Sequence, residues 1–101
     1  VAVGNVVVFA PSHANLVGVY DVATSMFETP ASTGSLTIDY KFYGATAVGN
    51  IVVFGPTNAD VVGVYDVTAR TFDGSVSTVG VTRDWKFGGA AAVGNIVVFA
   101  P

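Results

Sequence analysis

Residues 47–54 read Ala-Val-Gly-Asn-Ile-Val-Val-Phe, and almost the same eight residues stand at 2–9 and at 92–99. The offset is 45 residues both times, a period typical of repeat proteins whose units stack side by side. Residues 2–46 and 47–91 are identical at 24 of 45 positions without a gap, and 92–101 repeat 2–11 with one change. The chain therefore consists of two full repeats and a duplicated first strand.

The composition excludes several classes of protein, among them disordered chains and small domains stabilised by disulfides. The chain has 101 residues, of which 51% are hydrophobic and 11% charged, and it has no cysteine. We expect one small domain, 1–101, that is neither disordered nor held by disulfides. No apolar run reaches the roughly 18 residues of a membrane-spanning helix. Four basic residues against seven acidic ones argue against nucleic acid and anionic membranes as partners.

Each repeat is predicted to form β-strands. In the second repeat the strands are expected at 50–55, which Pro56 closes, at 61–67, at 71–76 and at 85–93. The Gly-Asn pairs at 49–50 and 94–95 suit compact hairpin turns. Four short antiparallel strands in about 45 residues are typical of one β-propeller blade. The predicted fold is therefore an all-β propeller of four-stranded antiparallel blades.

The motifs also resemble a known family. Residues 49–54 are similar to the second strand of a kelch-type blade, and 64–72 are similar to its third strand, turn and aromatic fourth-strand opening. Residues 19–27 repeat the latter pattern. The chain departs from the kelch pattern after the second strand, where Ala10-Pro11 and Gly55-Pro56 stand in place of a glycine pair. Because propellers host binding, scaffolding and enzymatic functions alike, the resemblance implies the fold more than a function.

Two blades do not close a ring, since propellers contain about four to eight. We expect the chain to associate with itself through cyclic symmetry. Three copies, giving six blades, are favoured, and four copies, giving eight, come second. The strand at 93–101 duplicates the one at 3–11, so one of the two is redundant, and a blade built from strands of two chains is expected. Which of the two is displaced stays open.

Because the strands are antiparallel, two kinds of loop lie on one face of the propeller. They are the loops between the second and third strands of a blade and the loops from one blade to the next. Any ligand site is expected there, where polar groups and aromatic rings gather. Tyr40 and Trp85 suit stacking on sugar rings, and the competing interpretation is that both rings pack between adjacent blades. The residues expected on this face are His13, Asn15, Asp39, Tyr40, Lys41, Asn58, Asp60, Asp84, Trp85 and Lys86.

Three further features have mainly structural interpretations. His13 lies next to Ser12, but a catalytic triad also needs a carboxylate that orients the imidazole, so an exposed loop histidine is expected. Asp21 and Asp66 are predicted to accept backbone N–H groups in the turns that follow them. Asp39 and Asp84, at the start of the innermost strands, are candidates for a ring of carboxylates that holds calcium or that Lys41 and Lys86 neutralise.

The sequence thus favours a structural or assembly role, in a chain excised from a longer repeat protein or designed. A carbohydrate-binding module is the alternative. We expect no enzymatic activity, no cofactor and no metal, because no P-loop, no cluster of His and Cys residues and no paired catalytic carboxylates are recognisable.

Overall fold

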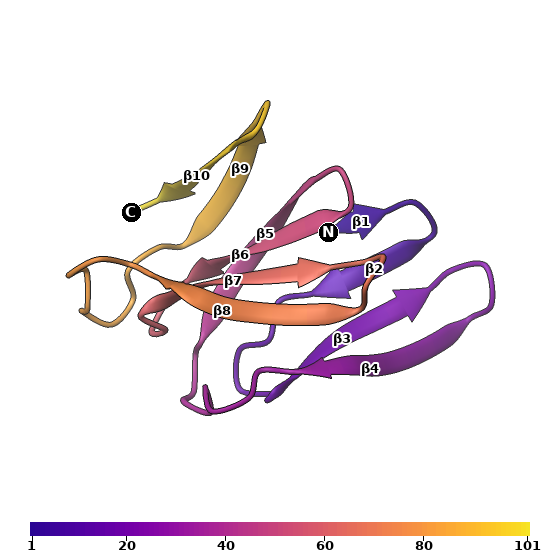
Figure 1. The fold of residues 1–101 in the computed structure, drawn as a ribbon, viewed down its shortest axis with the longest axis horizontal. Coiled ribbons are helices and arrows are strands. Elements are labelled where there is room, and N and C mark those ends of the chain that lie inside the picture. The colour runs from indigo at the N-terminus through magenta and orange to yellow at the C-terminus, as the bar shows by residue number, and fades with distance from the viewer.

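The computed structural model describes residues 1–101, which form three antiparallel sheets (Figure 1). In the first and second sheets four strands lie side by side in chain order, and the third sheet has two strands. The first sheet contains β1 (Ala2–Val3), β2 (Val6–Phe9), β3 (Leu16–Asp21) and β4 (Met26–Ser32). The second contains β5 (Phe42–Val48), β6 (Ile51–Pro56), β7 (Val61–Asp66) and β8 (Thr71–Ser77), and the third β9 (Gly89–Val93) and β10 (Ile96–Ala100).

Two kinds of turn set the strand order. The hairpins β1–β2, β5–β6 and β9–β10 turn at Gly4, Gly49 and Gly94, whose φ angles are 57°, 59° and 58°. A positive φ at the first turn residue is the geometry of a type II′ hairpin and favours glycine there. After β7, Asp66 Oδ1 accepts the N–H groups of Thr68 and Ala69 at 2.9 and 3.0 Å. Asp21 does the same after β3, so the turn role predicted for both aspartates is confirmed.

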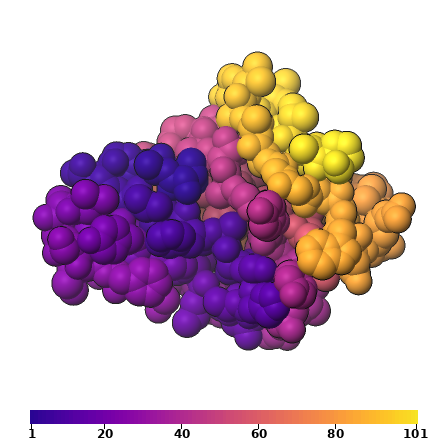
Figure 2. Space-filling view, turned by 180° about the vertical axis from the view of Figure 1, so that it is seen from behind, coloured from indigo at the N-terminus to yellow at the C-terminus, as the bar shows by residue number.

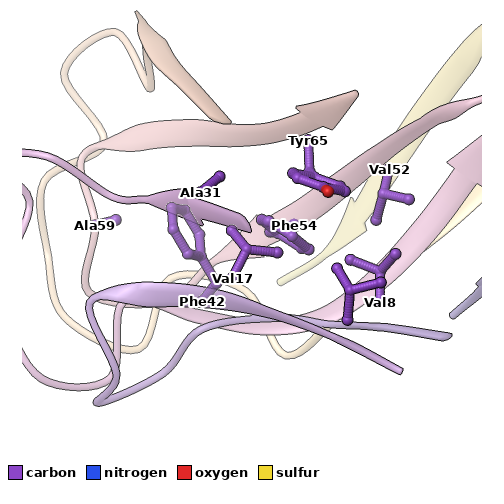
Figure 3. Close-up of a cluster of buried hydrophobic side chains, with 9 residues drawn as sticks. Val8, Val17, Ala31, Phe42, Val52, Phe54, Ala59 and Tyr65 are labelled. Carbon is purple, nitrogen blue, oxygen red and sulfur yellow. The ribbon is translucent and has the colours of Figure 1, made fainter. Parts of the chain in front are cut away.

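The first two sheets pack face to face and enclose the core (Figure 3). The first sheet contributes what we call the valine face, made of Val8, Val17, Val19 and Ala31. The second sheet contributes its opposite face, the aromatic face, made of Phe42, Val52, Phe54 and Tyr65. The two sheets are built from corresponding residues of the repeat and still present different faces to each other, the valine face of the first and the aromatic face of the second.

The third sheet stands beside the second sheet and not inside the core. β9 lies next to β5, and a Cβ added at Gly44 would approach the Gly89 Cα to 3.4 Å. Figure 2 shows this hairpin projecting from the body of the molecule. The first strands of the second and third sheets, β5 and β9, thus meet at two glycines that occupy the same position of the repeat. The chain contains no helix long and apolar enough to span a membrane.

The predicted strand at 85–93 is shorter than expected and begins only at Gly89. Trp85 has a φ of 57°, and its counterpart Tyr40 has a φ of 54°, values at which a strand cannot continue. Asp39 and Asp84 therefore lie in loops before the innermost strands, and their predicted place at the start of those strands is wrong. The strands begin later because of tertiary contacts. Lys41 and Lys86, which follow these residues, bond to a loop of the preceding sheet.

Candidate interaction surface

The predicted site residues lie in four loops, which we call the loop face. These loops join the second to the third strand of a sheet, at 10–15 and 57–60, or one sheet to the next, at 33–41 and 78–88. Backbone hydrogen bonds connect them in sequence. Lys41 N–H donates to Ser12 O at 3.0 Å, and Thr57 N–H donates to Lys41 O at 2.9 Å. Lys86 N–H then donates to Thr57 O at 2.9 Å, a bond equivalent to that of Lys41 with Ser12 because both residues are shifted by 45 positions.

Lys41 is fully buried and ties the start of the second sheet to a loop of the first sheet. Its ammonium donates to three backbone carbonyls of the 10–15 loop, at 3.3 Å to Ser12, 3.2 Å to His13 and 2.9 Å to Ala14. Burial lowers the pKa of the Lys41 ammonium below its ordinary value, and the negative charge of Asp39 opposes that shift. A lysine without solvent contact is stable there because all three of its N–H groups have an acceptor.

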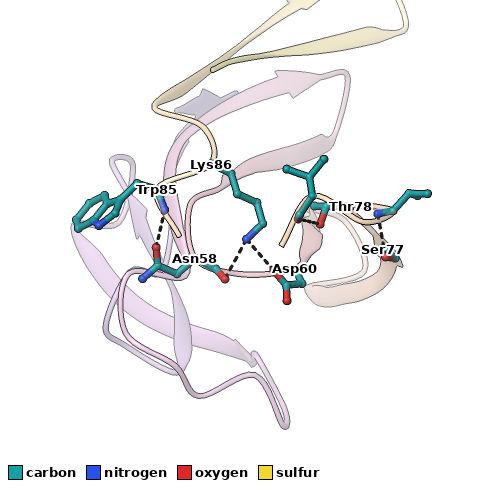
Figure 4. Close-up of polar contacts among 8 residues, drawn as sticks. Asn58, Asp60, Ser77, Thr78, Trp85 and Lys86 are labelled. Carbon is teal, nitrogen blue, oxygen red and sulfur yellow. Dashed lines mark hydrogen bonds and ion pairs between the residues drawn. The ribbon is translucent and has the colours of Figure 1, made fainter. Parts of the chain in front are cut away.

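Lys86 makes the equivalent contact one repeat later (Figure 4). Its side chain is also fully buried, and its ammonium lies 3.2 Å from Asn58 O and 2.7 Å from Asp60 Oδ1. The lysine predicted to neutralise Asp84 thus pairs with Asp60 instead. Lys86 pairs with Asp60 because its side chain points back to the 57–60 loop of the second sheet.

The rings of His13, Tyr40 and Trp85 form a row across the loop face. The ring centroids of His13 and Tyr40 are 4.2 Å apart, and those of Tyr40 and Trp85 are 4.9 Å apart. Trp85 N–H donates to Asn58 Oδ1 at 2.9 Å, which fixes the backbone beneath its ring. Tyr40 is 44% exposed and Trp85 67% exposed. The row therefore links neighbouring loops and still presents ring surface to solvent.

The remaining predicted residues do not join this row. The side chains of Asn15, Asp39 and Asp84 make no hydrogen bond or ion pair, and no group of three or more His, Cys, Asp or Glu side chains is placed to hold a metal ion. The side chain of His13 lies 3.4 Å from Ser12 Oγ, and no carboxylate orients its imidazole. The loop face thus brings together the cations, the rings, Asn58 and Asp60.

A second surface, whose residues were not named from the sequence, consists of the faces that the two full sheets leave open. Each sheet has a face of both kinds, made of the residues 45 positions away from those already named. On the aromatic face of the first sheet, Phe9 and Phe27 are exposed. On the valine face of the second sheet, Val76 is 58% exposed, whereas its counterpart Ala31 is buried against the neighbouring sheet. The signal available in the sequence was Gly18 and Gly63, because a glycine inside a strand often marks a close approach by another group.

Comparisons with known proteins support the fold alone. No protein-family model matches the chain, and no curated protein matches it, so the resemblance to kelch repeats is not confirmed. A solved structure of the computationally designed Ika8 protein is similar, with a TM-score of 0.60 and 18% sequence identity. The similarity covers 94% of this chain and 27% of the designed chain. The chain thus has an all-β architecture of antiparallel four-stranded sheets that also occurs within a longer designed protein.

Proposed function

We propose that the chain is a self-assembling unit of a β-propeller, and that its role is structural. The observation that carries this proposal is the pair of open faces. Inside the chain the valine face of the first sheet packs on the aromatic face of the second. The aromatic face of the first sheet and the outer part of the valine face of the second are uncovered. The two free faces are therefore of the same complementary kinds as the two faces already in contact.

Such an arrangement joins copies head to tail. A head-to-tail interface produces a ring when the rotation between copies closes and a filament when it does not. The near approach of Gly44 to Gly89 supports closure, because it brings the first strands of neighbouring sheets together, as the innermost strands of blades meet around a propeller axis. With two blades from each chain, three copies give six blades and four give eight. We propose the ring of three and keep the ring of four as the second candidate.

Light scattering on the purified chain, measured over a series of dilutions, tests this function. A mass above that of the monomer that falls on dilution supports self-assembly, and a monomer at every micromolar concentration contradicts it. Removal of residues 92–101 takes away β10 and the end of β9. This deletion is expected to lower the mass towards that of the monomer. If the full oligomer persists, ring closure does not depend on the duplicated segment.

Carbohydrate binding is the second candidate function, and the exposed rings of Tyr40 and Trp85 favour it. Adjacent aromatic faces with an amide beside them suit the C–H surface and hydroxyl groups of a sugar. Trp85 is the single tryptophan of the chain, so its fluorescence reports on this surface directly. A change in emission on adding sugars, absent in Trp85→Ala, supports the candidate. Unchanged emission together with an empty glycan array removes it.

A further inference from the structure

Two adjoining hollows lie along the first sheet, where its innermost strand is only two residues long. The larger, of about 470 Å³, lies over Gly18 and is lined by Phe9, Leu16 and Phe27. The smaller, of about 310 Å³, lies between β2 and β5 and is lined by Val8, Phe9 and Gly44, among others. Both hollows touch Phe9, Ala10 and Ser12, so together they follow the end of β2 beyond Val8, whose backbone pairs with that of Val1.

The second sheet shows what fills the equivalent space. Phe42, the first residue of β5, lies so close over Gly63 that an added Cβ would come within 2.7 Å of its ring. The Phe42 ring contacts Phe54 and Phe72, with centroid distances of 5.7 and 6.1 Å. In the first sheet the counterparts Phe9 and Phe27 are 6.4 Å apart, and the third ring is missing from the position over Gly18.

The third sheet has the phenylalanine that the first sheet lacks, but not the strands that it would cover. Phe87 occupies the position of Phe42 in the repeat, and its ring lies 5.5 Å from that of Phe99. The third sheet has no third or fourth strand, so nothing in it corresponds to Gly63 or Phe72. One end of the chain therefore offers a phenylalanine without its glycine, and the other end offers a glycine without its phenylalanine.

We propose that Phe87 and β9 of one copy complete the first sheet of a second copy. The Phe87 ring enters the hollow over Gly18, between Phe9 and Phe27 of the second copy, and residues 88–90 follow the smaller hollow along β2. The second sheet gives the register, in which Ala45 pairs with Phe54 and Val48 with Ile51. The equivalent pairs across the interface are Ala90 with Phe9 and Val93 with Val6. This inference rests on the proposed self-assembly and specifies its interface.

The loops supply a second, independent match. Within the chain, Thr57 N–H donates to Lys41 O, and Asn58 N–H donates to Tyr40 O, both at 2.9 Å. One repeat later the acceptors are Lys86 O and Trp85 O, and neither accepts a hydrogen bond in the chain. The matching donors, Ser12 N–H and His13 N–H, are also without a partner. Joining the copies as proposed brings these two donors to these two acceptors.

The displaced strand in this arrangement is β10. β2 contains the fully buried Val8, and the loop after it is held by the three bonds of Lys41. β10, by contrast, contains no buried residue, so its displacement uncovers no part of the core. The incoming β9 also displaces the N-terminal segment from β2, because Ala91, Ala92 and Val93 repeat the positions of Val1, Ala2 and Val3. In the chain, Val1 exchanges two backbone hydrogen bonds with Val8, at 2.8 and 2.9 Å. Ala2 and Val3 pair with Val7 and Val6.

Cysteine cross-linking of the full chain tests the register, since the sequence has no cysteine of its own. Paired Cα atoms of antiparallel strands lie about 4.5–5.5 Å apart, which is within the span of a disulfide. Ala92→Cys and Val7→Cys chains are mixed and oxidised. The expected result is a disulfide-linked dimer in the mixture that is absent from either variant alone. Ala92→Cys mixed with Val8→Cys is the matched control, because neighbouring residues of a strand point to opposite faces.

The outcomes separate the interface from the function. An oligomer by mass that gives no Ala92→Cys to Val7→Cys link overturns the inference and leaves self-assembly standing. A link between Val97→Cys and Tyr20→Cys instead means that the whole β9–β10 hairpin is exchanged, which also overturns it. A monomer in every mixture overturns both. As an independent readout, Gly18→Val fills the hollow and is expected to abolish the oligomer while the chain keeps the β-sheet circular dichroism of the parent.

Discussion

Phe9 and Phe54 occupy the same position in the two repeats, yet Phe9 is 50% exposed and Phe54 is fully buried. Their strands have the same neighbours on one side, because β2 pairs with β3 as β6 pairs with β7. On the other side, β5 pairs with β6 over its length, whereas the N-terminal segment pairs with β2 only as far as Val8. Phe54 also lies on the face that packs against the first sheet, whereas the corresponding face around Phe9 is open. The exposure of Phe9 is therefore a property of its incomplete surroundings and not of its sequence.

The same side-chain deletion is expected to have different effects at these two positions. Phe54→Ala removes a buried ring from the core and should lower the free energy of unfolding by about 3–5 kcal/mol. Phe9→Ala should cost the dilute monomer much less, because half of its ring is already in water. Urea denaturation at low protein concentration measures both. Equal losses for the two variants would contradict the described difference between the sheets.

Gly18 and Gly63 form a second matched pair. An added Cβ at Gly63 would lie 2.7 Å from Phe42 Cζ in a packed core, so Gly63→Ala is expected to destabilise the chain by about 1–3 kcal/mol through overpacking. At Gly18 the nearest atom is Phe27 Cε1 at 3.1 Å, on an exposed ring that can move. Gly18→Ala should thus leave the thermal midpoint of the dilute monomer nearly unchanged. A large loss at Gly18 alone would disprove the open hollow.

Lys41 is expected to stabilise the contact between the first two sheets. Lys41→Met removes the side-chain donor to the carbonyls of Ser12, His13 and Ala14 and leaves those of His13 and Ala14 without any. It should lower the free energy of unfolding by about 1–3 kcal/mol. Arg70→Met is a suitable control, because the pair of Arg70 with Glu28 is exposed and exposed pairs contribute little. If both variants lose the same stability, the buried lysine does not hold the loops together.

The lowered pKa of Lys41 also predicts a pH dependence. The unfolded lysine has a pKa of about 10.4, so above the lower folded pKa the unfolded chain binds more protons than the folded one. The contribution of Lys41 to the free energy of unfolding is therefore constant at neutral pH and rises with pH until about 10.4. Urea denaturation of the parent and of Lys41→Gln from neutral to alkaline pH isolates this contribution. A difference between them that falls as pH rises would contradict the direction of the shift.

Local chemistry explains what the sequence predicted correctly. Gly49 and Asp66 act on their own turns, so the hairpins and the four-strand order were recognisable without a structure. The strand expected from Trp85 failed because its limits depend on a distant contact, the bonds of Lys86 to the 57–60 loop. The hollow over Gly18 was likewise not recognisable, because it exists only where no phenylalanine takes the place that Phe42 has over Gly63.

The mass of the assembled chain decides whether its open faces join copies into a closed ring. Native mass spectrometry distinguishes multiples of the 10.3 kDa chain and thereby counts the copies, each of which supplies two of the proposed blades. The account predicts a closed species of three copies, and four copies would preserve the head-to-tail interface with a larger ring. A monomer at micromolar concentration would contradict the claim that the open aromatic face of the first sheet and the open valine face of the second belong together.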